Sequence, residues 1–478
     1  HDVWGEMIMI IKQSALWLAV AGVLAGTGAQ ASGFALQEQG VSGLGQAYAG
    51  SAAVAEDAST IWFNPAGMTR LEGRSAVAGG HGLLINAEFT NQGSSLSATG
   101  TAALSATLPA VAPTTISGAN ADGGVDAFVP NFYYAMPMGE KGWFGLGVNV
   151  PFGLSTEYPQ GWVGRYHALE STMTTINASP SFAYKFNDKV SFGGGLNILY
   201  ADATLTNAID LAGVCRGLEF ATTFAAGTCA ATGQATTGST ASDGRVELSG
   251  DGMGYGFNLS TLIQATDRTR IGFSFKSQIS MELEGRADFT NPTAGAAVWT
   301  AANLFQDTNA KAKVRLPASF SASIAHELDD KWTLLADVTR TNWSSFQELR
   351  FKFDNATQPD GVTTEDWDDS YRVSLGGQYQ YSPAMLLRAG IAYDQTPVPN
   401  DERRTARIPD SDRTWLSFGV GYKPSDNLTI DAAFTHVMAD SVNINNTLEG
   451  SVATANHTLT GRFEGEVNLF SVQARYEF

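Results

Sequence analysis

The last nine residues, Phe470-Ser-Val-Gln-Ala-Arg-Tyr-Glu-Phe478, alternate strictly between apolar and polar side chains. A β-strand directs these two sets to opposite faces. One face suits lipid and the other suits a wet lumen, as in transmembrane barrels. A strand of a soluble β-sandwich would show the same alternation, so this segment alone leaves both folds open.

The alternation recurs in about fourteen segments from Ser75 onward, each at least roughly the 9–11 residues that a tilted strand needs to cross the hydrocarbon. Every second connection is a tight turn, such as Asn187-Asp188 or Ser382-Pro383. The other connections are long and span 89–125, 152–171, 204–248, 287–312, 354–366, 395–412 and 443–464. Short periplasmic turns that alternate with long outer loops are typical of transmembrane barrels. Because an open sheet edge cannot persist in lipid, the sequence predicts an all-β fold, a closed antiparallel transmembrane β-barrel of about 14 strands over residues 75-478.

The composition agrees with a barrel and argues against other classes. Only 16% of the 478 residues are charged, and the mean hydropathy is -0.08. Soluble globular proteins usually carry more charge, and a helical membrane protein would contain several apolar runs of about 20 residues. The net charge of -18 argues against nucleic acid as a partner, because phosphate binding needs a basic surface.

A single apolar run, near the N-terminus, predicts a secretory signal peptide over residues 7-31. Lys12 supplies the positive region, residues 15–24 form the apolar stretch, and Ala29-Gln30-Ala31 offers a small-x-small cleavage site. A membrane anchor is the alternative, but the apolar stretch is short for one. The terminal Phe478 resembles the C-terminal signal that the outer-membrane assembly machinery reads. Together these features predict export to the outer membrane of a Gram-negative bacterium.

Residues 32-74, between the signal and the first strand, are small and turn-rich, as in Ser42-Gly-Leu-Gly45. Small residues allow tight packing inside a barrel, and the Asn64-Pro65 step breaks regular structure. A barrel of about fourteen strands is wider than the eight-stranded kind that side chains can fill, so something should occupy the lumen. The segment is therefore either an N-terminal hatch that plugs the lumen or a flexible periplasmic extension, and composition leaves the two equal.

Several motifs resemble the FadL-type family of outer-membrane long-chain fatty acid transporters. The hatch motifs are Gly33-Phe34, Ser42-Gly-Leu-Gly45-x-Ala47-Tyr48, Ala55-Glu-Asp-Ala58 and Asn64-Pro65-Ala66, and later ones are Trp343-Ser-Ser-Phe346, Tyr371-Arg372 and Ile408-Pro-Asp410. The resemblance covers the mature chain nearly end to end and weakens in the long outer loops.

The resemblance implies a barrel plugged by its own N-terminus, with a low-affinity groove on the outer loops and a high-affinity pocket inside. Ligand would leave sideways, through an opening made by an inward kink of the third strand. By position, Gly33 and Phe34 match the N-terminus that contacts the inner pocket. Asn64-Pro65-Ala66 matches the hatch motif that lies against the kinked strand, here from Gly145 to Pro151.

Two outer loops carry apolar residues at helix-like spacing, which we interpret as the outer groove. They include Leu211, Leu218 and Phe220 in one loop, and Trp299 and Phe305 in the other. Exposed apolar patches usually mark binding sites. The alternative is that the two loops pack on each other and merely cap the barrel.

A fatty acid also needs a cation or donors for its carboxylate. Glu348, Arg350 and Lys352 share one face of a predicted strand, and we expect that face to be luminal, because a midplane charge that faces lipid costs roughly 2–4 kcal/mol. Arg350 stands about where the family carries a basic pocket residue. The alternative is a structural ion pair between Arg350 and Glu348 or a hatch carboxylate, Glu56 or Asp57.

Other charged and sulfur-containing residues suggest structural roles. Cys215 and Cys229 should pair outside the cytoplasm, which would contribute on the order of 3 kcal/mol of loop constraint. Two cysteines and scattered histidines lack zinc spacing, so we expect no metal and no cofactor. The arginines of one outer loop either bind lipopolysaccharide phosphates or are simply solvated; they are Arg403, Arg404, Arg407 and Arg413.

The favoured function is passive uptake of long-chain fatty acids by binding, hatch rearrangement and lateral release. The same mechanism acting on toluene-like aromatic hydrocarbons is the alternative, and a structural or adhesive barrel would need no hatch. An enzyme is not expected, because no Gly-x-Ser-x-Gly motif marks a nucleophile. The expected partners are a fatty acid or another hydrophobic small molecule, outer-membrane lipid with lipopolysaccharide, and the assembly machinery. The protein is expected to be a monomer.

Overall fold

The computed structural model describes residues 33–107, 115–234, 236–293 and 295–478. The predicted signal peptide at residues 7-31 lies outside the described residues. Among the helices that are described, none is both long enough and apolar enough to cross a membrane.

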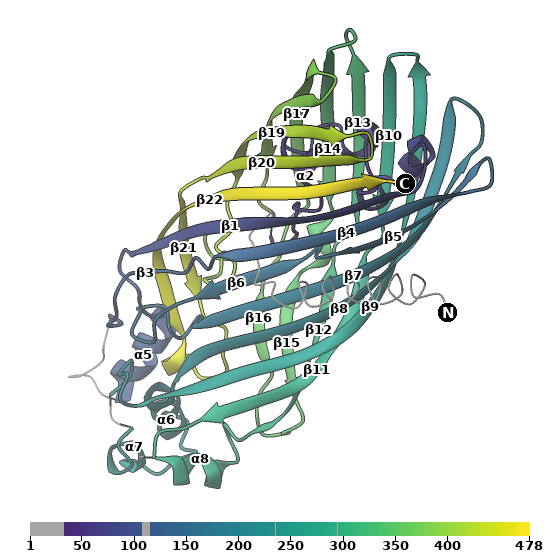
Figure 1. Cartoon of the computed structure of the whole chain (residues 1–478). Helices are drawn as coiled ribbons and strands as arrows, with labels where there is room; N and C mark the ends of the chain where they lie inside the picture. The colour runs from purple at the N-terminus through teal and green to yellow at the C-terminus, as the bar shows by residue number, and fades with distance from the viewer. Residues whose placement is uncertain (1–32, 108–114, 235, 294) are drawn as a thin grey trace, which may run out of the picture.

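Fourteen antiparallel strands close on themselves and form the wall of a barrel (Figure 1). The last strand pairs with the first, from Ser75 opposite Glu477 to Asn91 opposite Gly461. In order round the wall, the strands are β1 (Ser75–Asn91), β4 (Ala127–Met138), β5 (Gly142–Asn149), β7 (Glu170–Lys185), β8 (Val190–Asp210), β9 (Asp243–Thr266), β10 (Thr269–Lys276), β13 (Ser319–Glu327), β14 (Trp332–Thr341), β17 (Ser370–Ser382), β18 (Met385–Asp394), β19 (Arg413–Ser425), β20 (Leu428–Ala439) and β22 (His457–Glu477). The fold predicted from the sequence is confirmed.

The alternation of the last nine residues becomes the two faces of the wall. Phe470 and Val472 of β22 are more than half exposed, whereas Ser471 and Gln473 between them are buried. Apolar side chains that are exposed on the wall of such a barrel face the lipid. A buried polar side chain needs hydrogen-bond partners in the lumen. The barrel therefore has an apolar outside and a polar, filled inside.

The outer end of the barrel carries a sheet extension and a group of short helices. The extension consists of β11 (Ile279–Thr290), β12 (Thr308–Leu316), β15 (Glu348–Phe353) and β16 (Gly361–Thr364), which continue from β9. The helices are α5 (Ala98–Thr107), α6 (Leu211–Phe220), α7 (Thr228–Ala231) and α8 (Ala296–Ala302). They gather at the end opposite the tight turns and the C-terminus (Figure 1). The short elements β2 (Ser95–Leu96), β3 (Ala121–Asp122), β21 (Val442–Thr447), η2 (Trp343–Ser345) and η3 (Ala453–Ala455) complete this outer part.

The segment before β1 fills the lumen as a hatch. It forms four short helical turns, α2 (Val41–Leu44), α3 (Ser51–Val54), α4 (Thr60–Phe63) and η1 (Pro65–Arg70). Its backbone lies directly on glycines of the wall. A Cβ atom on Gly272 would stand 1.8 Å from the carbonyl oxygen of Ala52, and one on Gly390 would stand 2.2 Å from that of Gln46. The hatch is therefore seated against the wall and is not a free extension.

The third wall strand is interrupted. β5 ends at Asn149, and its continuation β6 (Gly153–Glu157) begins only after three residues that lie outside both strands. β7 pairs with both pieces. β4 pairs with β5 from Phe132 onward, and the described pairings give residues 127–131 no partner on that side. The hydrogen-bond ladder of the wall therefore has a gap beside Val150, Pro151 and Phe152.

Candidate functional site

An apolar pocket lies between the hatch and the outer loops. Phe34 of the N-terminal segment lines it together with Leu283 of β11, Val314 of β12, and Leu349 and Phe351 of β15. Its empty volume is about 710 Å³, including the part that opens to solvent. Sites for small molecules are lined mostly by apolar side chains with a few polar groups, so the lining of this pocket suits a hydrocarbon chain.

Phe34 closes this pocket on the hatch side and is itself held by four aromatic rings. Its ring centroid lies 4.8 Å from that of Trp343, 5.5 Å from Phe346, 5.9 Å from Trp367 and 6.1 Å from Phe152. The pairs with Trp343 and Phe346 are edge-to-face, an arrangement that stabilises two rings beyond the burial of their area. We call these five residues the aromatic box.

Gly33 is placed where only glycine fits. Its φ of +62° is a left-handed conformation that side chains disfavour. A Cβ atom would lie 2.6 Å from an atom of Trp367 and 2.9 Å from one of Trp343. The Gly33 amide also donates a hydrogen bond of 3.1 Å to the carboxylate of Asp410. Gly33 therefore allows the chain to enter the aromatic box.

The residues that follow Phe34 fill the gap in the wall. The amide of Leu36 donates to the carbonyl oxygen of Pro151 at 2.9 Å, and the amide of Gly153 donates to that of Phe34 at 3.0 Å. Ala35 and Phe152 form an antiparallel β-bridge between these two bonds. The N-terminal segment thus adds a short strand to the interrupted edge, a common mode of reversible binding.

Buried amides hold Gln39, three residues after Leu36, against the same strand. The Gln39 side chain donates to the carbonyl oxygen of Val150 at 2.7 Å and accepts from the amide group of Asn149 at 2.8 Å. The hydroxyl of Tyr133 donates to the backbone carbonyl of Gln39 at 2.8 Å. Buried polar groups that are paired in this way resist displacement, because an unpaired one is costly. Gln39 therefore marks the fixed end of the gap-filling segment.

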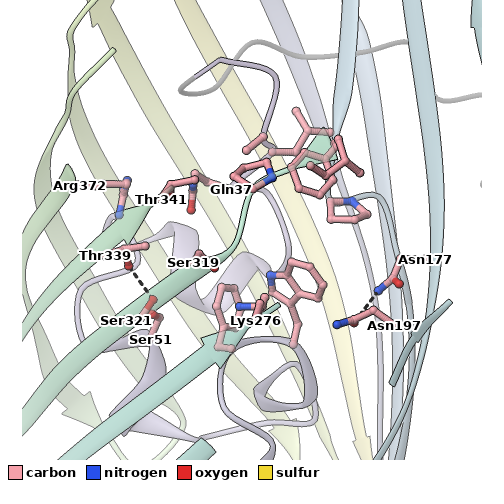
Figure 2. A pocket seen from close by; sticks show the side chains of 18 of the residues that line it. Gln37, Ser51, Asn177, Asn197, Lys276, Ser319, Ser321, Thr339, Thr341 and Arg372 are labelled. Atoms are coloured by element: carbon pink, nitrogen blue, oxygen red, sulfur yellow. Dashed lines mark hydrogen bonds between the residues drawn. The ribbon is translucent and has the colours of Figure 1, made fainter. Parts of the chain in front are cut away.

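A second cavity lies between the hatch and the wall and touches the gap (Figure 2). It is lined by Pro151 and Phe152 of the gap, by Trp62 of the hatch, and by two wall cations, Lys276 and Arg372. We call it the lower cavity. Sequence reasoning missed both cations as site residues. The signal for Lys276 was its position in the strand. It lies two residues after Ser274 and four after Gly272, which both face inward, so its side chain is expected on the same inward face.

A buried ionic cluster fastens the hatch to the wall. The guanidinium of Arg388 on β18 lies 2.6 Å from the carboxylate of Glu56 in the hatch and 2.9 Å from that of Asp431 on β20. The amide group of Gln473 donates to the neighbouring hatch carboxylate, Asp57, at 3.0 Å. The hatch carboxylates therefore pair with β18 and β22, and not with Arg350 as one alternative supposed.

The Asn64-Pro65-Ala66 motif lies elsewhere than expected. The Asn64 side chain donates to the carbonyl oxygen of Thr261 on β9 at 3.1 Å, and the Ala66 amide donates to the hydroxyl of Ser260 at 3.0 Å. The backbone of Pro65 and Ala66 also lies on Gly193 of β8. The motif therefore rests on β8 and β9, and the expectation that it lies against the kinked strand is wrong. Two neighbouring hatch side chains cover Gly145 instead, since a Cβ there would lie 2.5 Å from Met68 and 2.7 Å from Ile61.

The apolar residues of the outer loops pack on each other. Leu211 and Trp299 are fully buried in one cluster, and Leu218 and Phe305 are partly buried against it. Phe220 is 51% exposed. The prediction of an open groove is therefore wrong for Leu211 and Trp299, and the alternative of a packed cap describes these loops. Helical spacing indicates an apolar face, but it does not indicate what covers that face.

Arg350 faces away from the pocket. Leu349 and Phe351 line the apolar pocket, whereas Glu348, Arg350 and Lys352 line the opposite side of β15. Arg350 lies 2.7 Å from Glu348 and 3.2 Å from the carboxylate of Asp360. The expectation of a luminal charged face is therefore wrong, because β15 belongs to the outer extension, where an outward charge meets water and not lipid. Arg350 forms the structural ion pair that was the alternative.

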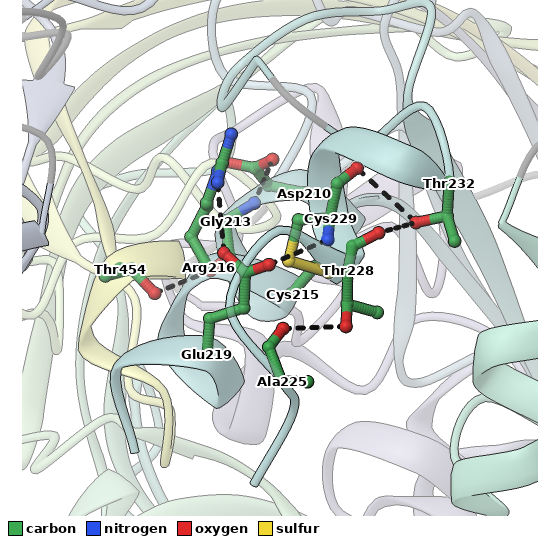
Figure 3. Close-up of a disulfide and its surroundings, with 10 residues drawn as sticks. All are labelled: Asp210, Gly213, Cys215, Arg216, Glu219, Ala225, Thr228, Cys229, Thr232 and Thr454. Carbon is green, nitrogen blue, oxygen red and sulfur yellow. Dashed lines mark hydrogen bonds and ion pairs between the residues drawn. A yellow bond between two sulfur atoms is a disulfide. The ribbon is translucent and has the colours of Figure 1, made fainter. Parts of the chain in front are cut away.

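A disulfide joins Cys215 of α6 to Cys229 of α7 (Figure 3). The carboxylate of Glu219 accepts a hydrogen bond of 2.8 Å from the amide of Cys229 and pairs with Arg216 at 3.0 Å. These contacts fasten α7 to α6. The disulfide therefore has a structural place in the outer cap.

The four outer arginines bind within the protein. Arg404 and Arg413 are buried and pair with Asp401 and Asp410. Arg407 donates to Ser171 and to backbone oxygens of β7 and β8, and Arg403 pairs with Asp366 at 2.9 Å. These contacts differ from both alternatives expected from the sequence, binding to lipopolysaccharide and simple solvation.

Comparisons with known proteins give a consistent picture. A family model described as outer membrane protein transport protein (OMPP1/FadL/TodX) matches residues 22–478. The long-chain fatty acid transport protein of Escherichia coli O6:H1 is 30% identical in an alignment of 467 residues that covers 96% of this chain and 98% of that protein. Outer membrane protein P1 of Haemophilus influenzae is 30% identical in an alignment of 478 residues with the same two coverages.

Solved structures share the fold. A Pseudomonas aeruginosa FadL homologue superposes with a TM-score of 0.79 at 25% identity, over 93% of this chain and 100% of that one. The Pseudomonas putida toluene transporter TodX superposes with a TM-score of 0.65 at 18% identity, over 94% and 100%. At that identity, the second likeness concerns the fold alone.

Proposed function

The chain belongs to the outer membrane protein transport family (OMPP1/FadL/TodX), whose members are outer-membrane transporters and channels and not enzymes, and we propose that it takes up long-chain fatty acids. The family resemblance drawn from the motifs and the outer-membrane location are confirmed. The chain is a transporter of hydrophobic compounds. In the proposed path, a fatty acid binds at the outer loops, enters the apolar pocket, displaces the N-terminal segment and leaves sideways between β4 and the interrupted third strand.

One observation carries the proposal. Phe34 lines the pocket, and the next two residues fill the gap in the wall. A ligand that needs the space of Phe34 must move this residue, and Ala35 and Leu36 move with it because the chain is continuous. The occupied pocket and the closed gap therefore exclude each other. This coupling would open the wall only when ligand is present.

The choice of fatty acid over hydrocarbon rests on two points. Curated relatives at 30% identity are named long-chain fatty acid transport proteins, whereas the toluene transporter shares the fold alone. The next residue after Phe34, Ala35, also lines the lower cavity, which holds cations. Monoaromatic hydrocarbons remain the second candidate, because the side chains that line the apolar pocket would accept a neutral ligand equally well.

Uptake in a Gram-negative host that lacks its own long-chain fatty acid transporter tests the proposal. We expect this protein to restore uptake of a labelled long-chain fatty acid. Ala312 lines the pocket, so Ala312→Trp should fill it and lower the uptake. Ala322 lies on the same face of β13 as the lipid-facing Phe320 and Ile324, so Ala322→Trp is the matched control and should leave uptake unchanged.

Uptake of labelled toluene is measured in the same cells. Transport of toluene without the fatty acid would replace the proposal with the hydrocarbon channel. Transport of neither, with protein folded in the outer membrane, would refute both.

A further inference from the structure

Lys276 brings a positive charge into the lower cavity, and we propose that it binds the carboxylate of a fatty acid between the apolar pocket and the gap in the wall. The inference rests on the proposed uptake of hydrophobic compounds and names the chemistry that this path would select. Lys276 is the last residue of β10, where the wall bends into β11. Figure 2 shows its side chain directed into the cavity.

The ammonium group of Lys276 forms no direct contact with a carboxylate of a described residue, and Asp337 of the same cavity acts on it only at longer range. In the part of the chain that the structure describes, it forms no ion pair and no hydrogen bond, and its nitrogen lies 4.6 Å from the ring centroid of Trp62. A cation–π contact stabilises an ammonium less than a carboxylate does in a desolvated place. Ionisable residues inside a membrane barrel are costly and usually face a pathway or a ligand. An anion that passes through the lower cavity is therefore well placed to pair with Lys276.

Two hydroxyl groups share the level of Lys276 in the wall. By register, Lys276 lies opposite Ser319 of β13, which in turn lies opposite Thr341 of β14. All three line the lower cavity, and the structure gives the hydroxyls of Ser319 and Thr341 no hydrogen bond to a described residue. A carboxylate has two oxygens that accept several hydrogen bonds. One ammonium with two adjacent hydroxyl donors matches this need.

The other charged groups of the cavity already have partners. The carboxylate of Asp337 accepts hydrogen bonds from Ser51 at 3.2 Å and from Thr339 at 2.9 Å, and a further one from Ser323. The guanidinium of Arg372 donates to the carbonyl oxygen of Ala47 in the hatch at 3.0 Å. Asp337 is therefore satisfied and Arg372 holds the hatch. Lys276 differs from Arg372 in that its ammonium forms no hydrogen bond at all to a described residue.

The location of Lys276 gives the site a place on the path. The same cavity is lined by Ala35 and Leu36 of the gap-filling segment and by Pro151 and Phe152 of the gap. A head group at Lys276 would lie below Phe34 and inside the gap. The site thus differs from the apolar pocket, where the hydrocarbon chain would bind. It would make passage favour acids over neutral molecules of the same length.

Binding of a labelled long-chain fatty acid, and of the fatty alcohol of the same length, to the full chain in lipid nanodiscs tests this inference. We expect the wild-type protein to bind the acid more tightly than the alcohol. Because hydrogen bonds to a charged group are stronger than neutral ones, Lys276→Met should weaken acid binding by about tenfold or more and leave alcohol binding unchanged. Lys276→Arg should retain the preference.

The control is Lys352→Met, which removes an outward-facing lysine of β15 and should change neither affinity. Ser319→Ala provides a second, milder variant that should weaken only the acid, even if Lys276→Met disturbs folding.

The outcomes separate this inference from the proposed function. Equal binding of acid and alcohol to the wild type, with no effect of the Lys276 variants, would overturn the carboxylate site and leave a channel for neutral compounds. An equal loss of acid and alcohol in Lys276→Met, with no selective loss in Ser319→Ala, would assign Lys276 a structural role and also overturn the site. Binding of neither ligand by the wild type would remove the proposed function itself.

Discussion

The backbone amide of Leu36 donates a hydrogen bond of 2.9 Å to the carbonyl oxygen of Pro151, which lies in the interruption of the third barrel strand. The bond from Gly153 to Phe34 lies on the other side of the Ala35–Phe152 bridge. Two bonds that flank a pair in this way define a non-hydrogen-bonded antiparallel pair, in which the Cα atoms lie about 4.5 Å apart. The N-terminus is thus part of the wall at this one place.

A disulfide between positions 35 and 152 should lock the gap. The short distance of a non-hydrogen-bonded pair lies within disulfide range, so Ala35→Cys with Phe152→Cys should cross-link under oxidising conditions. We expect fatty acid uptake to fall on oxidation and to return with a reductant. Wild-type protein with and without reductant controls for the native Cys215–Cys229 bond. Undiminished uptake in the fully cross-linked protein would exclude this gap as the exit.

Gly33→Ala should disturb the aromatic box. The added methyl group meets Trp343 and Trp367 at less than 3 Å on a left-handed backbone, and such overpacking usually costs about 1–3 kcal/mol. We expect weaker fatty acid binding and easier proteolysis of the N-terminal segment. Gly139→Ala is the matched control, because Gly139 also has a positive φ, of +72°, but has open space around it. Equal effects of the two variants would assign the loss to backbone strain alone.

Arg388→Met should loosen the hatch. It leaves the buried carboxylate of Asp431 and the partly buried one of Glu56 without their cation, and breaking a buried ion pair costs about 3–5 kcal/mol. Hydrogen exchange of the hatch amides should accelerate, and single-channel conductance in a planar bilayer should rise. Arg462→Met, which removes an exposed pair with Glu464, should change neither quantity. A tight hatch in Arg388→Met would contradict the role of this cluster.

Ligand binding should weaken at alkaline pH through Glu365. Burial raises the pKa of this outer-loop carboxyl from 4.5 to about 8, while Arg407 and Arg403 lower it and Glu449 raises it. Because the folded pKa is raised, the contribution of Glu365 to stability is fully present below its unfolded value and is lost as pH rises through about 8. Glu365 lies two residues before Trp367 of the aromatic box, so we expect ionisation of Glu365 to loosen the packing of the box. Fatty acid affinity should therefore fall as the pH rises through about 8, and Glu365→Gln should remove that part of the change.

Removal of the disulfide should affect the outer cap and spare the barrel. A cross-link that closes a loop of about 15 residues contributes about 3 kcal/mol, so Cys215→Ser with Cys229→Ser should expose residues 211–231 to protease. The barrel should keep its resistance to unfolding in detergent. Fatty acid uptake measures whether the cap guides ligand. Loss of the folded barrel itself would show that the cap matters beyond the outer loops.

Much of the fold was predictable from local pattern. Alternation in segments such as the last nine residues assigns two faces to each strand, and the tight turn at every second connection fixes the pairing of neighbours. Closure follows from the need to pair every backbone group in lipid. The interruption at Pro151 was expected only from the family resemblance. The sequence shows a short strand that ends before a proline, but it does not indicate whether another segment pairs with the wall at that place.

The site was less predictable, for reasons that the residues make clear. Alternation separates Arg350 from Phe351, but which of them is luminal depends on whether the strand lies in lipid or above it. Helical spacing identified Leu211 and Trp299 as an apolar face without indicating that they cover each other. Lys276 was missed because a single lysine at the end of a strand carries no motif. Its parity with Ser274 is visible in the sequence, but its level beside Ser319 becomes visible only when the pairing of the strands is known.

The seating of the hatch on bare glycines has a consequence for the cell envelope. Gly272 and Gly390 leave room for a backbone and for nothing else, so one added carbon at either place should lift the plug from its seat. A barrel of this width without its plug would admit water, salts and polar antibiotics. The barrier that the outer membrane offers at this protein therefore depends on wall positions that have no side chain. When these glycines are substituted, we expect a rise in outer-membrane permeability to be the first effect.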